Sequence, residues 1–118
     1  MPRFDSYRSS TWNDGSVLTG VQNDGTILVS VTVPAPGFYL IGVTGCCDVA
    51  WNYDLKHYAA DGTTQRNSQR RILGAGSEDW IFPAPFECYS GDQFVIKLVG
   101  AVTPVTGLQM SIFPTLLG

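Results

Sequence analysis

The chain of 118 residues is long enough to bury one hydrophobic core without metal or disulfide crosslinks, so we expect a single globular domain. Hydrophobic residues make up 44% of the chain and charged residues only 14%, while thirteen glycines and seven prolines are typical of a β protein with many turns. The seven Lys and Arg residues and the net charge of −3 argue against a nucleic-acid partner, which needs grouped cations. No apolar run reaches the roughly 18 residues of a membrane span, so we predict no membrane partner.

The N-terminal residues are polar and contain no apolar signal-peptide core. We therefore predict an N-terminal arm at residues 1–14 and a β domain at residues 15–118. Asn-Asp-Gly occurs at 13–15 and again at 23–25, and Asp-Gly is a strong tight-turn signal. These turns predict a short strand at 16–22 and a longer one at 26–33.

Alternation along the 26–33 segment places one set of side chains on a common face: Ile27, Val29, Val31 and Val33. The corner Pro34-Ala35-Pro36-Gly37 then interrupts the pattern before a strand at 38–44, and Pro83-Ala84-Pro85 repeats the corner later in the chain. Proline has no N–H to give to a strand ladder. The paired prolines therefore predict the end of one strand and a fixed crossing to the next.

The segment 49–58 has the cleanest alternation in the chain. We predict that one set of residues faces the core, namely Val49, Trp51, Tyr53, Leu55 and His57. The intervening polar residues then face solvent. An Asp-Gly turn at 61–62 closes this strand, and the polar segment 64–71 is expected to form an edge strand or an exposed loop.

Further short strands are predicted at 72–73, 80–82, 93–99 and 108–113. In the strand at 93–99, Phe94, Ile96 and Leu98 share one face. About eight short strands without a helical period indicate an antiparallel sandwich or barrel.

The three cysteines, Cys46, Cys47 and Cys88, do not have the spacing of a disulfide framework. Neighbouring residues of a strand point to opposite faces, so at most one of Cys46 and Cys47 could reach Cys88. We expect small buried side chains in a reducing compartment, with a Cys88 disulfide as the alternative. Metal binding is disfavoured because a tetrahedral zinc site needs a fourth ligand and His57 is the only imidazole.

No catalytic constellation stands out, so we predict a non-enzymatic protein without a cofactor. His57 is in phase with an apolar face and is expected to pack in the core or at its rim, although a cysteine could approach it in three dimensions. Glu78, Asp79 and Glu87 are the acids closest together in the second half of the chain. We interpret them as solvated loop acids, with a glycosidase pair or a calcium site as the alternative.

Aromatic residues offer a further binding chemistry. Trp12 and Trp80 are the tryptophans expected to be exposed, and they are candidate ligand contacts for a carbohydrate. Packing at a protein interface is the commoner use of such side chains.

Three motifs together carry a resemblance to a known family. Val33-Pro34-Ala35-Pro36-Gly37-Phe38-Tyr39, Gly91-Asp92-Gln93-Phe94-Val95 and Ser111-Ile112-Phe113 follow in the order seen in the tumour necrosis factor and complement globular-head superfamily, over residues 24–118. The resemblance implies an all-β, antiparallel two-sheet jelly-roll sandwich of about eight strands. It also implies a homotrimer, with Tyr39, Phe94 and Phe113 at the trimer interface.

From these observations we expect a structural module whose trimer decorates or stabilises a larger assembly. A phage capsid or other virion protein is the partner that we predict, with assembly in the host cytoplasm. The alternative is an extracellular binding module, secreted or on a surface, which recognises a protein or a glycan as many members of the superfamily do.

Overall fold

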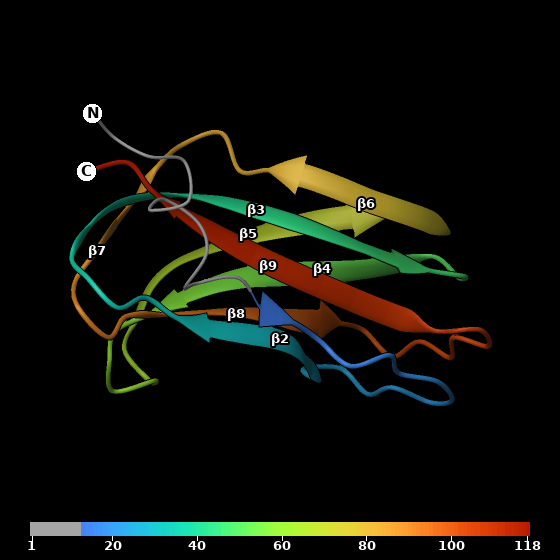
Figure 1. The fold of residues 1–118 in the computed structure, drawn as a ribbon. Helices are drawn as coiled ribbons and strands as arrows, with labels where there is room; N and C mark the ends of the chain where they lie inside the picture. The colour runs from blue at the N-terminus through green and yellow to red at the C-terminus, as the bar shows by residue number, and fades with distance from the viewer. Residues whose placement is uncertain (1–12) are drawn as a thin grey trace.

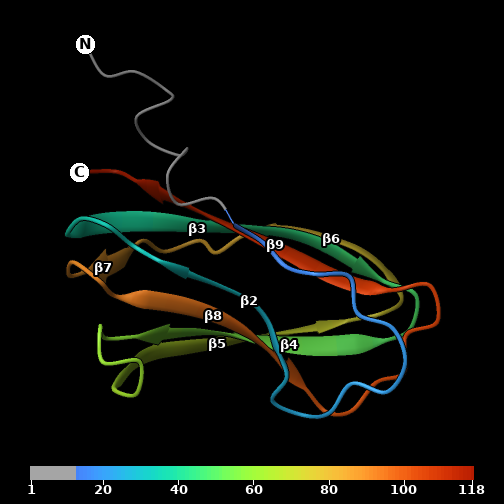
Figure 2. The same cartoon turned by 60° about the horizontal axis from the view of Figure 1, so that its bottom comes forward.

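The computed structural model describes residues 13–118, which form two antiparallel sheets packed face to face (Figures 1 and 2). The five-stranded sheet contains, in spatial order, β1 (Asn13–Asp14), β9 (Leu108–Leu116), β3 (Gly37–Cys47) and β6 (Gly76–Ile81), with β7 (Phe86–Cys88) also paired to β3. The four-stranded sheet contains β2 (Ile27–Thr32), β8 (Gln93–Val99), β4 (Trp51–Tyr58) and β5 (Gln65–Leu73). The all-β two-sheet prediction is confirmed. No helix in this part of the chain is long and apolar enough to cross a membrane.

Strand pairing runs from the two ends of the chain toward its middle. β1 pairs with β9, β2 with β8, β3 with β6 and β7, and β4 with β5. This pairing is that of one long antiparallel hairpin wrapped so that successive pairs alternate between the two sheets. The result is a jelly roll, as predicted.

The two proline corners have different structural roles. Pro34–Pro36 carries the chain from β2 in one sheet to β3 in the other, as expected. Pro83–Pro85 instead separates β6 from β7, and both of these strands pair with β3. Gly42 pairs with Ile81 of β6, and Tyr39 pairs with Phe86 of β7. Two residues of β3 lie between these pairs, but the segment from β6 to β7 has four. The second corner is therefore a two-residue bulge, and β6 and β7 are the two parts of one interrupted strand beside β3.

The core lies between the sheets and consists of the inward-facing residues of both. Trp51, Tyr53 and Leu55 of β4 are buried, as the alternation predicted. On β8, Phe94, Ile96 and Leu98 are likewise at most 1% exposed. The predicted inner faces of these two central strands are confirmed. The prediction that the intervening polar residues of β4 face solvent is wrong for Asp54, which is only 6% exposed because Arg70 donates to both of its carboxylate oxygens.

At the N-terminal end the structure differs from the expected pattern. A register shift between Ile27 and Val29 leaves Ile27 57% exposed and buries Leu28, so the predicted face of β2 is wrong at its first residues. The segment 16–22 makes isolated bridges at Leu18 and Gln22 instead of a continuous strand. Residues 13 and 14 were predicted to lie in the arm, yet they pair with β9; residues 1–12 lie outside the described residues.

Candidate functional site

The outer face of the five-stranded sheet carries exposed apolar side chains. Phe38 on β3 is 48% exposed, Ile81 on β6 is 58% exposed, and Leu117 just after β9 is 49% exposed. The Leu117 amide donates to the Phe38 carbonyl at 2.7 Å, which sets these two residues side by side. We call the surface formed by Phe38, Gly42, Ile81, Phe113 and Leu117 the apolar face.

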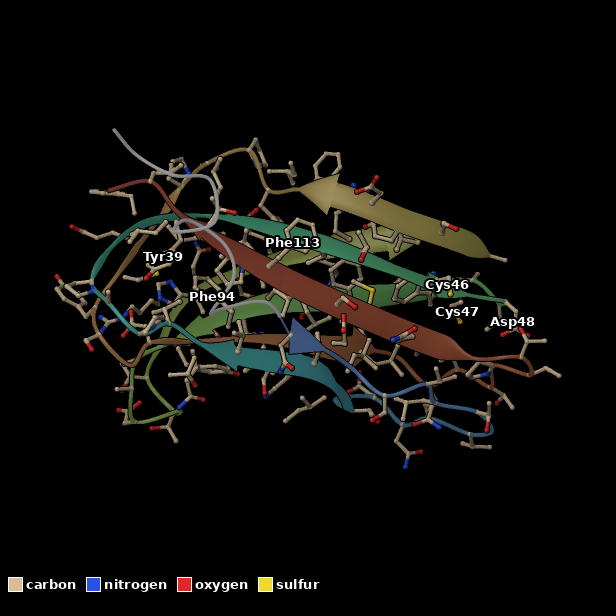
Figure 3. The ribbon with its side chains drawn as sticks, viewed as in Figure 1. Tyr39, Cys46, Cys47, Asp48, Phe94 and Phe113 are labelled. Atoms are coloured by element: carbon tan, nitrogen blue, oxygen red, sulfur yellow. The ribbon has the colours of Figure 1, made fainter. Side chains whose placement is uncertain are left out.

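One row of residues crosses the middle of the apolar face. Phe113 and Ile81 pair with Gly42 from opposite sides, so all three residues point outward. A Cβ built on Gly42 would lie only 2.2 Å from Cε2 of Phe113, because the phenyl ring lies across the glycine. The ring therefore covers the centre of this face (Figure 3), and only a glycine leaves room for it.

Charge is divided between the two sheets. The strands of the four-stranded sheet carry all five cations of the described chain, Lys56, Arg66, Arg70, Arg71 and Lys97, against the single acid Asp54. The strands of the five-stranded sheet carry four carboxylates and no cation: Asp14, Glu78, Asp79 and Glu87. Glu78 is buried between the sheets, so the other three carboxylates are the ones that border the apolar face with negative charge.

The structure corrects two of the three predicted interface residues. Tyr39 is 1% exposed and Phe94 is 0% exposed within the single chain, so neither side chain offers surface to another copy (Figure 3). The predicted positions fall on inward-facing residues of β3 and β8. Phe113 is the exception, because it lies on the outer face of β9.

At one end of the sandwich, two of the motifs noted in the sequence bind each other. The Val33 amide donates to the Asp92 carbonyl at 2.9 Å, and the Gly91 amide donates to the Val33 carbonyl at 2.9 Å. Gly91 has a φ of +84°, which favours glycine in this turn. The Tyr39 hydroxyl donates to the Ala35 carbonyl at 2.7 Å and fixes the proline corner from inside.

Beneath this junction lies a polar cluster, which we define as the buried side chains of His57, Cys88 and Asp92 together with the partly exposed side chain of Arg66. His57 Nε2 is 2.9 Å from Oδ2 of Asp92 and 3.7 Å from Sγ of Cys88. Arg66 donates to both oxygens of Asp92, from Nε at 3.0 Å and from Nη2 at 3.3 Å. The Tyr89 amide donates to Oδ2 of Asp92 at 3.1 Å. Asp92, only 1% exposed, is thus the centre of the cluster.

Local backbone geometry explains how these side chains meet. The register of β4 and β5 shifts between His57↔Asn67 and Tyr58↔Gln65, which leaves Arg66 as the extra residue of a bulge. A bulge re-aims the side chain that it carries. His57 lies on the inner face of β4, as predicted, and its ring stacks on Phe94 with 4.5 Å between the centroids.

The electrostatics of the cluster are unfavourable for a cysteine nucleophile. Burial, helped by the charge of Asp92, raises the pKa of the Cys88 thiol to about 12. At neutral pH the thiol is therefore protonated and a poor nucleophile. Burial also acts to raise the pKa of Asp92, but hydrogen bonds from Tyr89, His57 and Arg66 outweigh it and hold that pKa below its usual range.

A pocket of about 480 Å³ opens beside the cluster. His57 and Arg66 belong to its lining, together with Thr64, Gln65, Asn67, Pro85, Phe86, Glu87 and Tyr89. Arg66 lies over the Tyr89 ring, with 4.8 Å between its guanidinium carbon and the ring centroid. The pocket gives solvent a path to the edge of the cluster.

The acids considered for catalysis do not converge. Glu78 and Asp79 are neighbours on β6, so their side chains point to opposite faces of the sheet. Glu78 is 5% exposed, which corrects its interpretation as a solvated loop acid. It accepts hydrogen bonds from the Tyr53 hydroxyl at 2.8 Å and from Arg71 Nε at 3.0 Å, and thereby joins the two sheets.

The two tryptophans predicted to contact a carbohydrate are Trp12 and Trp80. Trp80 is partly buried against the core, and the Arg71 guanidinium carbon lies 3.8 Å from its ring centroid. The ring face occupied by Arg71 is therefore closed to a sugar. Trp12 lies outside the described residues.

The cysteines are free, and the strand register excludes the alternative disulfide. Cys88 pairs with Gly37 at one end of β3, whereas Cys46 and Cys47 lie at the other end (Figures 1 and 3). Cys46 is nine residue steps along β3 from Gly37, which corresponds to about 30 Å, and a disulfide needs Cα atoms within about 7 Å. Cys88 instead approaches His57, as the sequence allowed.

Asp92 and Arg66 are the site residues that sequence reasoning missed. Asp92 was considered only as part of the Gly91-Asp92 motif, although it is in phase with the buried Phe94 and Ile96 of β8, and that phase was the available signal. Arg66 carried no signal, because its inward direction depends on the bulge in β5.

The protein can be classified by its fold, because comparisons with known proteins found no match: no protein-family model matches the chain, and no curated protein matches it. The structure defines the class of the protein as an antiparallel jelly-roll sandwich with an exposed apolar sheet face. The likeness to the tumour necrosis factor and complement superfamily stays a prediction based on the three motifs.

Proposed function

We propose that the protein is a non-enzymatic structural module that forms a homotrimer through its apolar face and, as a trimer, decorates or stabilises a larger assembly. The observation that carries this proposal is the exposure of Phe38, Ile81 and Leu117 on one sheet face. Exposed apolar side chains gathered on one face are typical of protein interfaces. The threefold symmetry comes from the resemblance of the sequence motifs.

The distribution of charge over the two sheets supports contact between the apolar face of one copy and the four-stranded sheet of the next copy. In a ring of three copies, each copy contacts one neighbour through one surface and the second neighbour through a different surface. The acids Asp79 and Glu87 border the apolar face. The other sheet carries the cations that are not bound to a carboxylate inside the sandwich, namely Lys56, Arg70 and Lys97. Contact between these surfaces brings opposite charges together, whereas face-to-face contact of two apolar faces brings the carboxylates together.

The oligomeric state tests the first part of the proposal. Size-exclusion chromatography with light scattering should give three times the 12.8 kDa mass of one chain. Ile81→Glu should shift the protein to monomers, because it places a charge in the apolar face. Ile27→Glu is the matched control, since Ile27 is 57% exposed on the other sheet against 58% for Ile81.

A monomer or a dimer of the unmodified chain at micromolar concentration contradicts the trimer. Dissociation by Ile27→Glu alone places the interface elsewhere.

The assembly step has its own test. We expect the trimer to be a virion or capsid component, so a tagged chain expressed in its native source should cosediment with large particles. Ile81→Glu should reduce this cosedimentation if the trimer is the form that docks. Recovery of the tagged chain only in the fraction of free protein would contradict a decorating role.

A further inference from the structure

The His57, Cys88 and Asp92 side chains come from three different elements and converge on one point. His57 lies on β4, Cys88 on β7, and Asp92 in the turn before β8. Their ligand atoms all lie within 4.8 Å of one another, and the three residues are buried. Imidazole nitrogen, thiolate sulfur and carboxylate oxygen are the three ligand types of protein zinc sites.

From this convergence we propose that the cluster is a binding site for a divalent cation of the zinc type, with His57 Nε2, Cys88 Sγ and Asp92 Oδ2 as ligands. Tetrahedral bonds of about 2.0–2.1 Å to nitrogen and about 2.3 Å to sulfur place those two atoms about 3.5 Å apart. The distance between Nε2 and Sγ is 3.7 Å. The 2.9 Å between Nε2 and Oδ2 has to widen by a few tenths of an ångström on binding.

The fourth coordination position explains how three protein ligands suffice. The sequence offers no second imidazole, but an open zinc site takes three protein ligands and one water. The pocket of about 480 Å³ includes His57 in its lining and has room for that water. The pocket also gives the ion a route from solvent to His57.

Charge and protons balance at this site. The Cys88 thiol releases its proton to solvent. Nε2 of His57 gives up the proton with which it donates to Asp92 in the metal-free cluster, and the neutral ring then holds its one proton on Nδ1, so that Nε2 offers its lone pair to the ion. One thiolate and one carboxylate then neutralise the dipositive ion inside the protein. Because protons leave on binding, affinity for the metal should rise with pH.

Arg66 is the residue that competes with the ion. Its Nε donates to the same Oδ2 that the metal would use, while its Nη2 donates to Oδ1 at 3.3 Å. The side chain is 33% exposed and borders the pocket, so it has space to withdraw from Oδ2 and keep Oδ1.

Cobalt binding to the full chain tests the site, because a cobalt–thiolate bond gives a charge-transfer absorption band in the near ultraviolet. We expect one Co²⁺ per chain with this band, displacement by Zn²⁺, and loss of the band in Cys88→Ser. Cys46→Ser is the matched control and should keep the band, since Cys46 is exposed at the far end of β3. Circular dichroism checks that each variant is folded, and Asp92→Asn gives a second loss variant if Cys88→Ser is not.

Three outcomes overturn the proposal. The first is a folded wild-type protein without the band at millimolar Co²⁺. The second is an undiminished band in folded Cys88→Ser. The third concerns Arg66→Ala, which should tighten Zn²⁺ binding about tenfold in calorimetry because the competitor is removed; weaker or unchanged binding contradicts the proposed ligand arrangement.

Discussion

Glu78 is a single residue that connects the two sheets. Its carboxylate lies on β6 of the five-stranded sheet and receives hydrogen bonds from Tyr53 on β4 and Arg71 on β5, both in the four-stranded sheet. Burial acts to raise the pKa of Glu78, but the bonds from Arg71 and Tyr53 outweigh it and leave that pKa below its usual range. The ionised form is therefore favoured by folding.

Glu78→Gln should lower the free energy of unfolding by about 1–3 kcal/mol at pH 7, because Arg71 loses its charged partner. A lowered pKa in the folded state stabilises the protein above the unfolded carboxyl pKa of about 4.3, and this contribution disappears as the pH falls below that value. Urea unfolding between pH 7 and pH 3 should thus show a smaller loss of stability in Glu78→Gln than in wild type. Equal slopes for wild type and Glu78→Gln would contradict the assignment.

Residue-level prediction from the sequence succeeded where periodicity alone decides the direction of a side chain. His57 was placed on the inner face of β4 correctly, because alternation there is regular. It failed for Arg66, which a bulge turns inward, and for Tyr39 and Phe94, whose interface role came from the resemblance and not from their phase in the strand. The polar cluster could therefore be predicted only in part.

At the scale of strands, Gly42 and Phe113 link β3 to β9 across the apolar face. Gly42 does not have a positive φ, so its role is one of space: an added Cβ would lie 2.2 Å from the Phe113 ring. We expect Gly42→Ala to cost about 1–3 kcal/mol in urea unfolding, the usual range for overpacking. The ring has to leave its place above β3.

A double-mutant cycle distinguishes this contact from a general weakening of β3. In the Phe113→Ala background the atoms that clash with the new methyl group are gone, so the penalty of Gly42→Ala should nearly vanish. Unfolding should be compared at one protein concentration, because association adds to apparent stability. Purely additive effects would show that the ring does not restrict position 42.

Strands with regular alternation were predicted correctly from the sequence, whereas irregular connections between strands were predicted only in part. β8 (Gln93–Val99) matches the predicted strand. Of the two alternatives for the polar segment 64–71, an edge strand or an exposed loop, the structure has the edge strand, and β5 also includes the separate strand predicted at 72–73. The two Pro-Ala-Pro corners look alike in sequence, yet one crosses between sheets and the other is a bulge. What separates them is the identity of the next partner strand, and that is a long-range property.

For the whole molecule, the division of charge between the sheets leads to a prediction about salt. If copies associate through unlike surfaces, the acids around the apolar face meet cations of the next copy, and these exposed pairs are screened by ions. Raising NaCl from about 0.1 M to about 1 M shortens the screening length from about 10 Å to about 3 Å. Sedimentation equilibrium should then show a dissociation constant that increases several-fold.

Asp79→Lys separates this electrostatic contribution from the apolar one. Asp79 is exposed on β6, two residues from Ile81, so the reversed charge should weaken association strongly at low salt and by much less at high salt. Ile81→Glu, in contrast, should weaken association at both salt concentrations, because it also removes apolar surface from the interface. Association of the wild-type chain that strengthens with salt would contradict the pairing of unlike surfaces. It would indicate that the apolar faces meet each other directly, which joins two copies and does not form a ring of three.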